Sequence, residues 1–498
     1  TSIHTWELIR KARRDNGARL VVVDPYRSRT ARYADLHLRP HPGTDGALAL
    51  AIGHVVVAED LHDHEFVATS TSGFDEYRAA VEAWTPARAE AETGVAASDI
   101  VDAARMIAHE RPTAIRLGVG LQRSTGSGSA LRAIQCLPAL TGQWRWAAGG
   151  IAGAVSLAYT NMSNLSRPDL RPPGTREVNM IQLGRVLTDP AMDPPIRSLY
   201  VWNSNPAVIA ADQQRVLEGL RRDDLFTVVH EQFLTDTARH ADIVLPATTM
   251  LEQADLVGSW GFSYLSWNDA VIEPLGEARS NSQVARDLAS RLGFEDEVFA
   301  LDDDALMELG MRGSIGEVTG VTAEQLREQG VVRVGPPVGA VAAEGAVFDF
   351  RCEALAGVGL HPVAAYVPPA HRPSDASPFG LRLLTLKRHW SINSSYGGLP
   401  VLLGAEPEPT VQIHPTDAAA RGVDDGVEVE VFNDLGRIRL RAQVTDAVPS
   451  GTVAVPFGRW QREPGDGGAN SLTSDELGDL AHGPTFCDNL VEVATLPG

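Results

Sequence analysis

The sequence predicts an α/β protein in which parallel-sheet units are followed by a carboxyl-terminal β-barrel of six-stranded type. Up to about residue 295, short apolar runs alternate with helical stretches, a pattern typical of a mostly parallel sheet with helices on both faces. Beyond residue 378 the hydrophobic period becomes two, and short alternating strands follow one another closely. A chain of 498 residues also exceeds what one hydrophobic core usually holds.

The chain divides into four expected segments. Two α/β units are predicted over residues 1–112 and 113–295. Residues 296–378 change character and are interpreted as a connector with limited structure of its own. Residues 379–498 are predicted to form the barrel.

The first unit begins with a helix over Trp6 to Asn16 that leads into a β-branched strand, Leu20 to Val23. Asp24-Pro25 ends this strand with an acidic acceptor at the carboxyl end, where open α/β sheets bind their ligands. The turn Pro42–Asp45 comes before an apolar helical stretch, residues 46–57. Further helices are expected over residues 74–84 and 101–109.

The second unit starts with a strand over residues 114–117 that breaks into Gly118, Gly120 and Gln122. This loop precedes a helix that ends near Gly142. The backbone N–H groups of the loop could therefore face a pyrophosphate at the helix start. The same order of strand, polar loop and helix recurs over residues 198–213 and 225–236.

The barrel region contains alternating strands, a plausible hairpin loop at residues 433–436 and one short helix over residues 417–422. The expected strands are residues 381–386, 410–413, 427–432, 437–444 and 452–455.

Charge and cysteine content exclude several classes of function. The net charge of −21 argues against a nucleic acid partner, because phosphate contacts need clustered Lys and Arg. Cys136, Cys352 and Cys487 lie far apart and cannot begin a zinc or iron–sulfur site, so a reducing, cytoplasmic setting is expected. No apolar run is long enough to span a bilayer.

Two polar motifs follow the first strand at a fixed order and spacing. Asp24-Pro25 is followed by the stretch Thr30-Ala31-Arg32-Tyr33-Ala34-Asp35, and then by Pro42-Gly43-Thr44-Asp45. This series resembles the molybdopterin-guanine-dinucleotide oxidoreductases, the group of dimethyl sulfoxide reductase and formate dehydrogenase. In that family these segments hold the guanosine end of one pterin cofactor, which implies binding roles for Asp24, Gly43, Thr44 and Asp45.

The resemblance continues through the later segments. In the family a glycine pair and a glutamine face the pterin, which implies that role for Gly118, Gly120 and Gln122. Asn203 and Asn205 end a strand with two amides that suit a guanine or ribose edge, or that simply close an Asx turn. The resemblance implies that Asn205, Glu231 and Thr237 hold a second guanosine, and that Arg388 and Asn470 of the barrel lie over both dinucleotides.

The family resemblance implies a bis-molybdopterin-guanine-dinucleotide cofactor with molybdenum or tungsten. Such enzymes exchange two electrons with a small substrate by oxygen-atom or hydride transfer, so a formate-dehydrogenase-like activity is one expectation. An electron-transfer protein or subunit is an expected partner. The protein's task is to position and tune the cofactor, which carries the redox step.

The family's metal-ligating residue and its 4Fe-4S cysteines lie upstream of the Asp24 strand. This chain begins at Thr1, on a predicted helix, so we expect an amino-terminally truncated part that is inactive alone. The 4Fe-4S cluster is expected only in the missing part, and an export signal could have been lost with it.

Two rival interpretations remain open from the sequence. One is a non-catalytic relative such as the large iron–sulfur subunit of respiratory complex I, although a scaffold needs no guanosine-directed side chains. The other is a nicotinamide-linked dehydrogenase, which Arg123 disfavours because it stands where the dinucleotide fingerprint has its third glycine.

Overall fold

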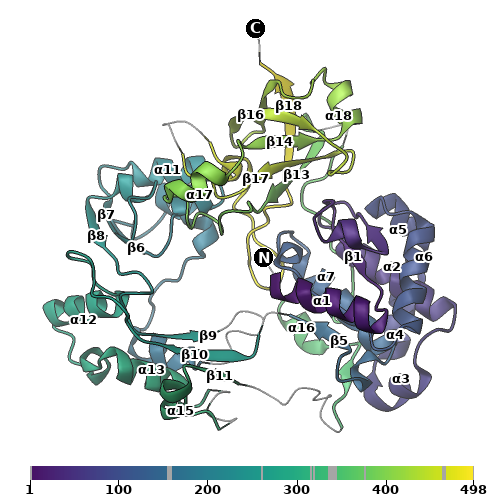
Figure 1. Cartoon of the computed structure of the whole chain (residues 1–498). Coiled ribbons are helices and arrows are strands. Elements are labelled where there is room, and N and C mark those ends of the chain that lie inside the picture. The colour runs from purple at the N-terminus through teal and green to yellow at the C-terminus, as the bar shows by residue number, and fades with distance from the viewer. Residues whose placement is uncertain are drawn as a thin grey trace.

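The computed structural model describes residues 3–153, 160–258, 262–314, 317, 320–334, 345–374, 377–461 and 467–496. Figure 1 shows a helix-rich first unit on the right, a second unit with its own sheet on the left, and the barrel above them. The fold is mixed α/β with parallel sheets and a closed carboxyl-terminal barrel, as the sequence predicts.

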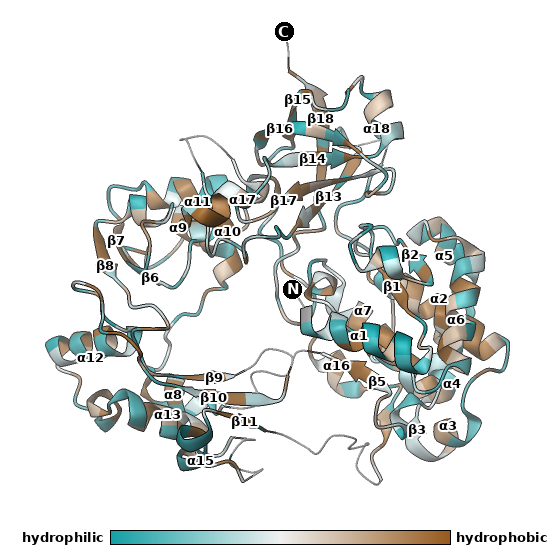
Figure 2. Ribbon diagram, viewed as in Figure 1, coloured by the Kyte–Doolittle hydropathy of each residue, from teal (hydrophilic) through white to brown (hydrophobic). Residues whose placement is uncertain are grey.

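The first unit is built around one buried helix, α2 (Asp45–Ala58). Its sequence is apolar on every face, which is typical of a helix that other elements surround completely. Figure 2 shows α2 in brown, whereas α1 (Ile3–Asn16) at the surface is largely teal. The helices around α2 are α4 (Phe74–Glu82), α5 (Pro86–Thr93), α6 (Ala97–His109) and α7 (Ser127–Leu140), and α3 (His64–Ser70) follows α2 directly.

Parallel strands carry the candidate site residues in both units. In the first unit β1 (Val21–Val23) pairs with β2 (Leu36–Leu38), and β4 (Ala114–Arg116) pairs with β5 (Gly150–Ala152). From the sequence, β4, α7 and β5 are expected in the second unit, but α7 packs on α2 in the core of the first unit, so the described boundary lies after β5. In the second unit β6 (Ser198–Trp202), β7 (Phe226–Glu231) and β8 (Ile243–Pro246) form one sheet. The parallel pairing confirms the prediction, but the described strands form several short sheets rather than one wide sheet. The helices beside β6–β8 are α9 (Leu183–Thr188), α10 (Pro206–Ile209) and α11 (Gln213–Leu220).

The expected connector, residues 296–378, has more structure than the sequence indicates. Its helices α13 (Asp303–Met311) and α15 (Ala323–Gln329) share a small apolar core with strand β11 (Val331–Arg333). That strand extends an antiparallel sheet with β9 (Asp255–Gly258) and β10 (Tyr264–Asn268). The prediction missed it because these elements are short and complete a core with residues that precede the segment. Other short elements here and nearby are α8 (Met162–Ser166), α12 (Asn281–Leu292), β12 (Phe348–Asp349) paired with β3 (Thr71–Ser72), and α16 (Glu353–Gly357).

The barrel closes through six strands in the order β13-β17-β14-β16-β15-β18. Alternate side chains of β16 (Arg437–Val444) are buried and exposed, as the two-residue period requires. The predicted hairpin loop joins β15 (Glu428–Phe432) to β16, with the Asn433 side chain accepting the N–H of Leu435 at 3.0 Å. The other strands are β13 (Leu381–Leu386), β14 (Thr410–Ile413), β17 (Thr452–Pro456) and β18 (Leu490–Thr495), and the helices are α17 (Pro400–Ala405) and α18 (Pro415–Ala420).

Across the described ranges, no helix combines the length and the apolar character needed to cross a lipid bilayer.

Candidate cofactor-binding site

Asp24 lies where β1 ends, as the sequence predicts. Its side chain accepts the backbone N–H of Tyr26 at 2.9 Å, and its carbonyl oxygen lies 2.9 Å from Nε2 of His37 on the neighbouring strand. Burial raises the pKa of the Asp24 carboxyl above its ordinary value. The edge formed by β1 and β2 therefore presents a partly desolvated acid.

The turn Pro42–Asp45 is packed tightly against other parts of the chain. Gly43 has φ +79°, and a Cβ there would lie 2.8 Å from Cγ of Pro369. Thr44 is buried, and its hydroxyl donates to the carbonyl oxygen of His41 at 2.7 Å. Gly43 and Thr44 therefore fix the shape of the turn that ends at Asp45.

Asp45 is the first residue of α2, and its carboxylate is the turn's available acceptor. Burial raises its pKa to about 6, and the negative charge of Asp24 adds to the effect. Within the described ranges, no side chain donates a hydrogen bond to it. Asp45 accepts a hydrogen bond from its own backbone N–H, and a ligand with further N–H donors would stabilise a carboxylate that is desolvated in this way.

Sequence reasoning missed Asp488, which joins this turn to the barrel. One carboxylate oxygen accepts the backbone N–H groups of Thr125 at 2.7 Å and of Ala370 at 3.2 Å. The other oxygen, Oδ1, is buried, has no hydrogen-bond partner among the described residues and would lie 3.1 Å from a Cβ at Gly43. The only sequence signal is its place in the loop before the last strand, which many residues share.

The glycine loop Gly118–Gln122 is open on its outer side. Gly118 and Gly120 are exposed, and a Cβ at either position would meet no atom of the described residues within 4 Å. The loop thus leaves room for a flat ligand, and Gln122 is exposed beside it.

The start of α7, which follows this loop, is already capped. The Asp479 carboxylate accepts the N–H groups of Gly128 at 2.7 Å and of Ser129 at 3.0 Å. An acid from the loop before the last barrel strand therefore already binds these N–H groups, and the expected pyrophosphate contact of the preceding glycine loop stays a prediction.

Two cations to which the sequence analysis gave no binding role lie together where three parts of the fold meet. The Arg123 guanidinium lies 5.1 Å from the ring centre of Phe486, and Nζ of Lys387 lies 4.0 Å from that of Phe457. These two rings pack on each other and on Ala211 of the second unit.

Neither cation has an acidic partner within the described residues. Lys387 hydrogen-bonds Asn393 but forms no ion pair, and Arg123 forms none either. Desolvation lowers the pKa of Lys387 to about 8, and the charge of Arg123 lowers it further. Two uncompensated positive charges side by side in a chain of net charge −21 indicate a place for an anion.

The second unit brings Asn203 and Glu231 to the carboxyl ends of the adjacent strands β6 and β7. Asn203 is exposed and has φ +51°, a conformation that asparagine tolerates better than most residues. Burial raises the pKa of Glu231, whose Oε1 accepts the neighbouring N–H of Gln232 at 2.7 Å. Both side chains can still receive a ligand.

Asn205 and Thr237 are buried and bound to each other rather than open to a ligand. The Thr237 hydroxyl donates to Oδ1 of Asn205 at 2.8 Å and accepts the N–H of Ala207 at 3.0 Å. The Asn205 amide donates to Asp236, which also accepts the N–H of Gln461 from the barrel at 3.0 Å. These contacts hold the loops after β6 and β7 together and attach them to the barrel.

The two barrel residues chosen from the sequence also make protein contacts. Asn470 is buried, and its amide donates to the carbonyl oxygen of Val208 in α10 at 3.3 Å. Arg388 is almost fully buried, pairs with Glu406 at 2.5 Å and donates to the carbonyl oxygen of Gly458 at 3.2 Å. Both residues therefore fix the barrel and its loops in place.

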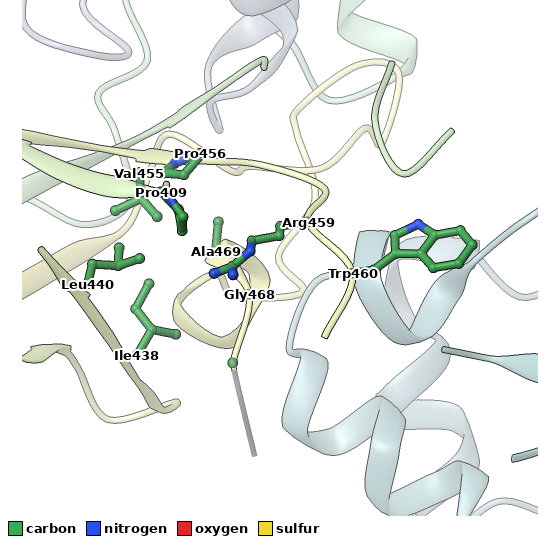
Figure 3. Close-up of a pocket in the computed structure, with 10 residues that line it drawn as sticks. Pro409, Ile438, Leu440, Val455, Pro456, Arg459, Trp460, Gly468 and Ala469 are labelled. Carbon is green, nitrogen blue, oxygen red and sulfur yellow. The ribbon is translucent and has the colours of Figure 1, made fainter. Parts of the chain in front are cut away.

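A small pocket lies beside Asn470 on the barrel. Figure 3 shows Arg459 turned toward Ala469 and Ile438, whereas Trp460 points away from the other side chains. The walls of the pocket are mostly apolar, and none of the site residues predicted from the sequence lines the pocket. The remaining lining residues are Pro409, Leu440, Val455, Pro456, Gly467 and Gly468.

Comparison with known proteins matches the geometry to one family. Residues 3–291 match the family model of molybdopterin oxidoreductases, and residues 381–490 match that of the molybdopterin dinucleotide binding domain. A probable oxidoreductase, YoaE of Bacillus subtilis, is 36% identical over 99% of this chain and 72% of its own length. Formate dehydrogenase H of Escherichia coli is 28% identical over 95% of this chain and 68% of its length.

The solved structure of acetylene hydratase from Pelobacter acetylenicus has the same fold. It aligns with a TM-score of 0.79 at 27% identity, over 98% of this chain and 75% of that structure. These matches give no support to a non-catalytic complex I subunit. The unpaired carboxylates and cations described above also fit a nucleotide-bearing anionic cofactor. The chain belongs to the molybdopterin oxidoreductase family.

Proposed function

We propose that this chain holds two molybdopterin guanine dinucleotides around one molybdenum or tungsten atom, and that the enzyme transfers an oxygen atom or a hydride to or from a small substrate. The bound cofactor supplies the two-electron redox chemistry. The chain binds and orients the cofactor and surrounds it with charged side chains. We further propose that the two α/β units, expected over residues 1–112 and 113–295 but divided after β5 in the structure, are cofactor-binding domains, and that 379–498 is a third domain joined by 296–378.

One observation supports the proposal: the desolvated Asp45 carboxylate and the Arg123 guanidinium, which forms no ion pair within the described residues, both lie near the segment around Cys487. Asp45 and Arg123 both influence the pKa of the Cys487 thiol, and the N–H of Cys487 donates to the carbonyl oxygen of Arg123 at 2.8 Å. A guanosine diphosphate group needs this combination. Its guanine N–H groups need a carboxylate acceptor, and its phosphates need cations.

In the first unit we assign guanine recognition to Asp45, assisted by Asp24 and the unpartnered Oδ1 of Asp488. Arg123 and Lys387 are assigned to the phosphates. Gly43 and Thr44 shape the turn, and the open backbone of Gly118 and Gly120 receives the pterin beside Gln122.

The second guanosine is assigned to Asn203 and Glu231. Asn205 and Thr237 are positioning residues for these two, because their polar groups are already paired. Arg388 and Asn470 are positioning residues as well, because their paired side chains hold the barrel loops over the site.

The electrons are proposed to pass to an iron–sulfur-bearing protein or subunit, and the setting is proposed to be the cytoplasm. Cys136, Cys352 and Cys487 are free thiols, which supports a reducing compartment.

The test is a calorimetric titration of the purified chain with guanosine diphosphate. We expect two binding sites per chain, one removed by Asp45→Asn and the other by Glu231→Gln. The control is Asp75→Asn, an exposed acid of α4 paired with Arg78. Unchanged binding in both variants would overturn the assignment of these residues.

A further inference from the structure

A cluster of one acid and two histidines lies outside the cofactor site, in the turn between α2 and α3. It consists of Asp60, His62 and His64, whose ligand atoms all lie within 4.8 Å of one another. In Figure 1, α3 lies at the end of the first unit away from the barrel. From this cluster we infer a second metal site, for a divalent transition-metal ion of the Zn²⁺ class, held by Asp60, His62 and His64.

The distances suit such an ion. Oδ1 of Asp60 lies 3.6 Å from Nδ1 of His62 and 3.2 Å from Nε2 of His64. Zn²⁺ binds imidazole nitrogen and carboxylate oxygen at about 2.0–2.2 Å, which puts tetrahedral ligand atoms about 3.3 Å apart. The same carboxylate oxygen is therefore at ligand spacing from both rings.

His62 supplies the second, independent indication of a ligand. Its Nδ1 is buried and has no hydrogen-bond partner in the part of the chain that the structure describes, although it faces the Asp60 carboxylate. A buried polar nitrogen without a partner is unfavourable, and a metal ion would satisfy it. The ring cannot easily turn away, because it packs at 5.0 Å on Phe74 and at 4.1 Å on His64.

The backbone holds the three ligands in place before any ion binds. The N–H of Asp60 donates to Val57 at 3.2 Å and that of Leu61 to Val56 at 2.8 Å, so the turn is attached to α2. Asp60 has φ +57°, which aspartate tolerates. The N–H of Asp63 donates to the carbonyl oxygen of Leu140, which attaches the turn to α7.

The ligand set also selects the class of ion. Two imidazoles and one carboxylate suit Zn²⁺, Co²⁺ or Ni²⁺ better than Mg²⁺ or Ca²⁺, which prefer oxygen ligands. Asp63, the acid between the histidines, caps α3 through the N–H of Phe66 and pairs with Arg145, so it is engaged elsewhere. Asp60 and His64 are exposed, which leaves the fourth position to water.

The ion would connect the end of α2 to the start of α3. Since α2 is the centre of the first unit's core, a bound ion should stabilise that unit. This role does not depend on the cofactor site.

The experiment titrates the untagged full chain with Co²⁺ and Zn²⁺, following the visible absorption of Co²⁺ and the heat of Zn²⁺ binding. We expect one ion per chain, a rise in the thermal midpoint with Zn²⁺, and loss of affinity by about tenfold or more in His64→Ala and Asp60→Asn. His62→Phe keeps the packing on Phe74 but removes the ligand nitrogen, and it should behave in the same way.

His414→Asn is the matched control, a histidine of the barrel that caps α18. It should bind Co²⁺ and Zn²⁺ as the parent chain does. Absence of Co²⁺ binding, or equal binding in His64→Ala and the parent chain, would overturn the inference.

Discussion

Asp488 and Thr125 are 363 residues apart in the chain and share two hydrogen bonds. The backbone N–H of Thr125 donates to Oδ2 of Asp488 at 2.7 Å, and the Thr125 hydroxyl donates to the same oxygen. This contact joins the last loop of the barrel to the loop before α7. It therefore fixes the barrel against the turn that contains Gly43 and Asp45.

Replacing Asp488 by alanine should leave two donors of Thr125 without their acceptor. We expect a loss of about 1–3 kcal/mol in the free energy of unfolding, since buried unpaired donors cost that much. Urea denaturation of the full chain measures it. Asp488→Asn keeps one acceptor and should lose less, so equal stability of Asp488→Ala and the parent chain would contradict this role.

Gly43→Ala should destabilise the chain for two reasons. Its φ of +79° costs an L-residue about 1–2 kcal/mol, and the new Cβ would also lie 2.8 Å from Pro369. Gly422→Ala is the matched control, because Gly422 has φ +62° with nothing within 4 Å. Thermal unfolding should show a larger loss for Gly43→Ala, and equal losses would show that the packing is unimportant.

Asp45 should make stability depend on pH. Its folded pKa of about 6 is raised above the unfolded value of 3.8, so its contribution to stability is present at low pH and lost as pH rises through about 6. Asp45→Asn should therefore be more stable than the parent by about 1–3 kcal/mol at pH 8 and no more stable near pH 4. Urea denaturation at both pH values checks this, and a variant less stable at pH 8 would contradict it.

Lys387 should control the binding of phosphate groups near its own pKa of about 8. The ammonium form attracts the anion, so guanosine diphosphate affinity should fall as pH rises from about 7 to about 9. Lys387→Met should bind more weakly at pH 7 and show a smaller fall. Lys11→Met, at the only other lysine, is the control and should match the parent in calorimetry. If Lys387→Met kept the parent's affinity and pH profile, the phosphate assignment would be wrong.

The sequence predicts the local elements well where one periodicity dominates. The apolar run of α2 and the alternating strand β16 leave little choice of structure. The small core of α13, α15 and β11 could not be predicted, because its elements are short and its partners Leu265 and Trp267 lie far upstream.

The candidate site also contains residues that the sequence predicts and residues that only the structure identifies. Motifs located the strand ends that bear Asp24 and Glu231 and the helix start that bears Asp45, but they could not show which polar groups already have partners within the protein. Asn205 and Thr237 look like ligand residues in sequence, yet they pair with each other. Asp488 has no distinctive neighbours, so only three-dimensional contacts identify it.

The most direct test of two guanosine sites on one chain is the guanine nucleotide content of the purified protein, released by acid and counted against molybdenum or tungsten. We predict two guanine nucleotides for each metal atom, and one in either Asp45→Asn or Glu231→Gln. A metal-loaded protein with one guanine nucleotide or none would contradict the account.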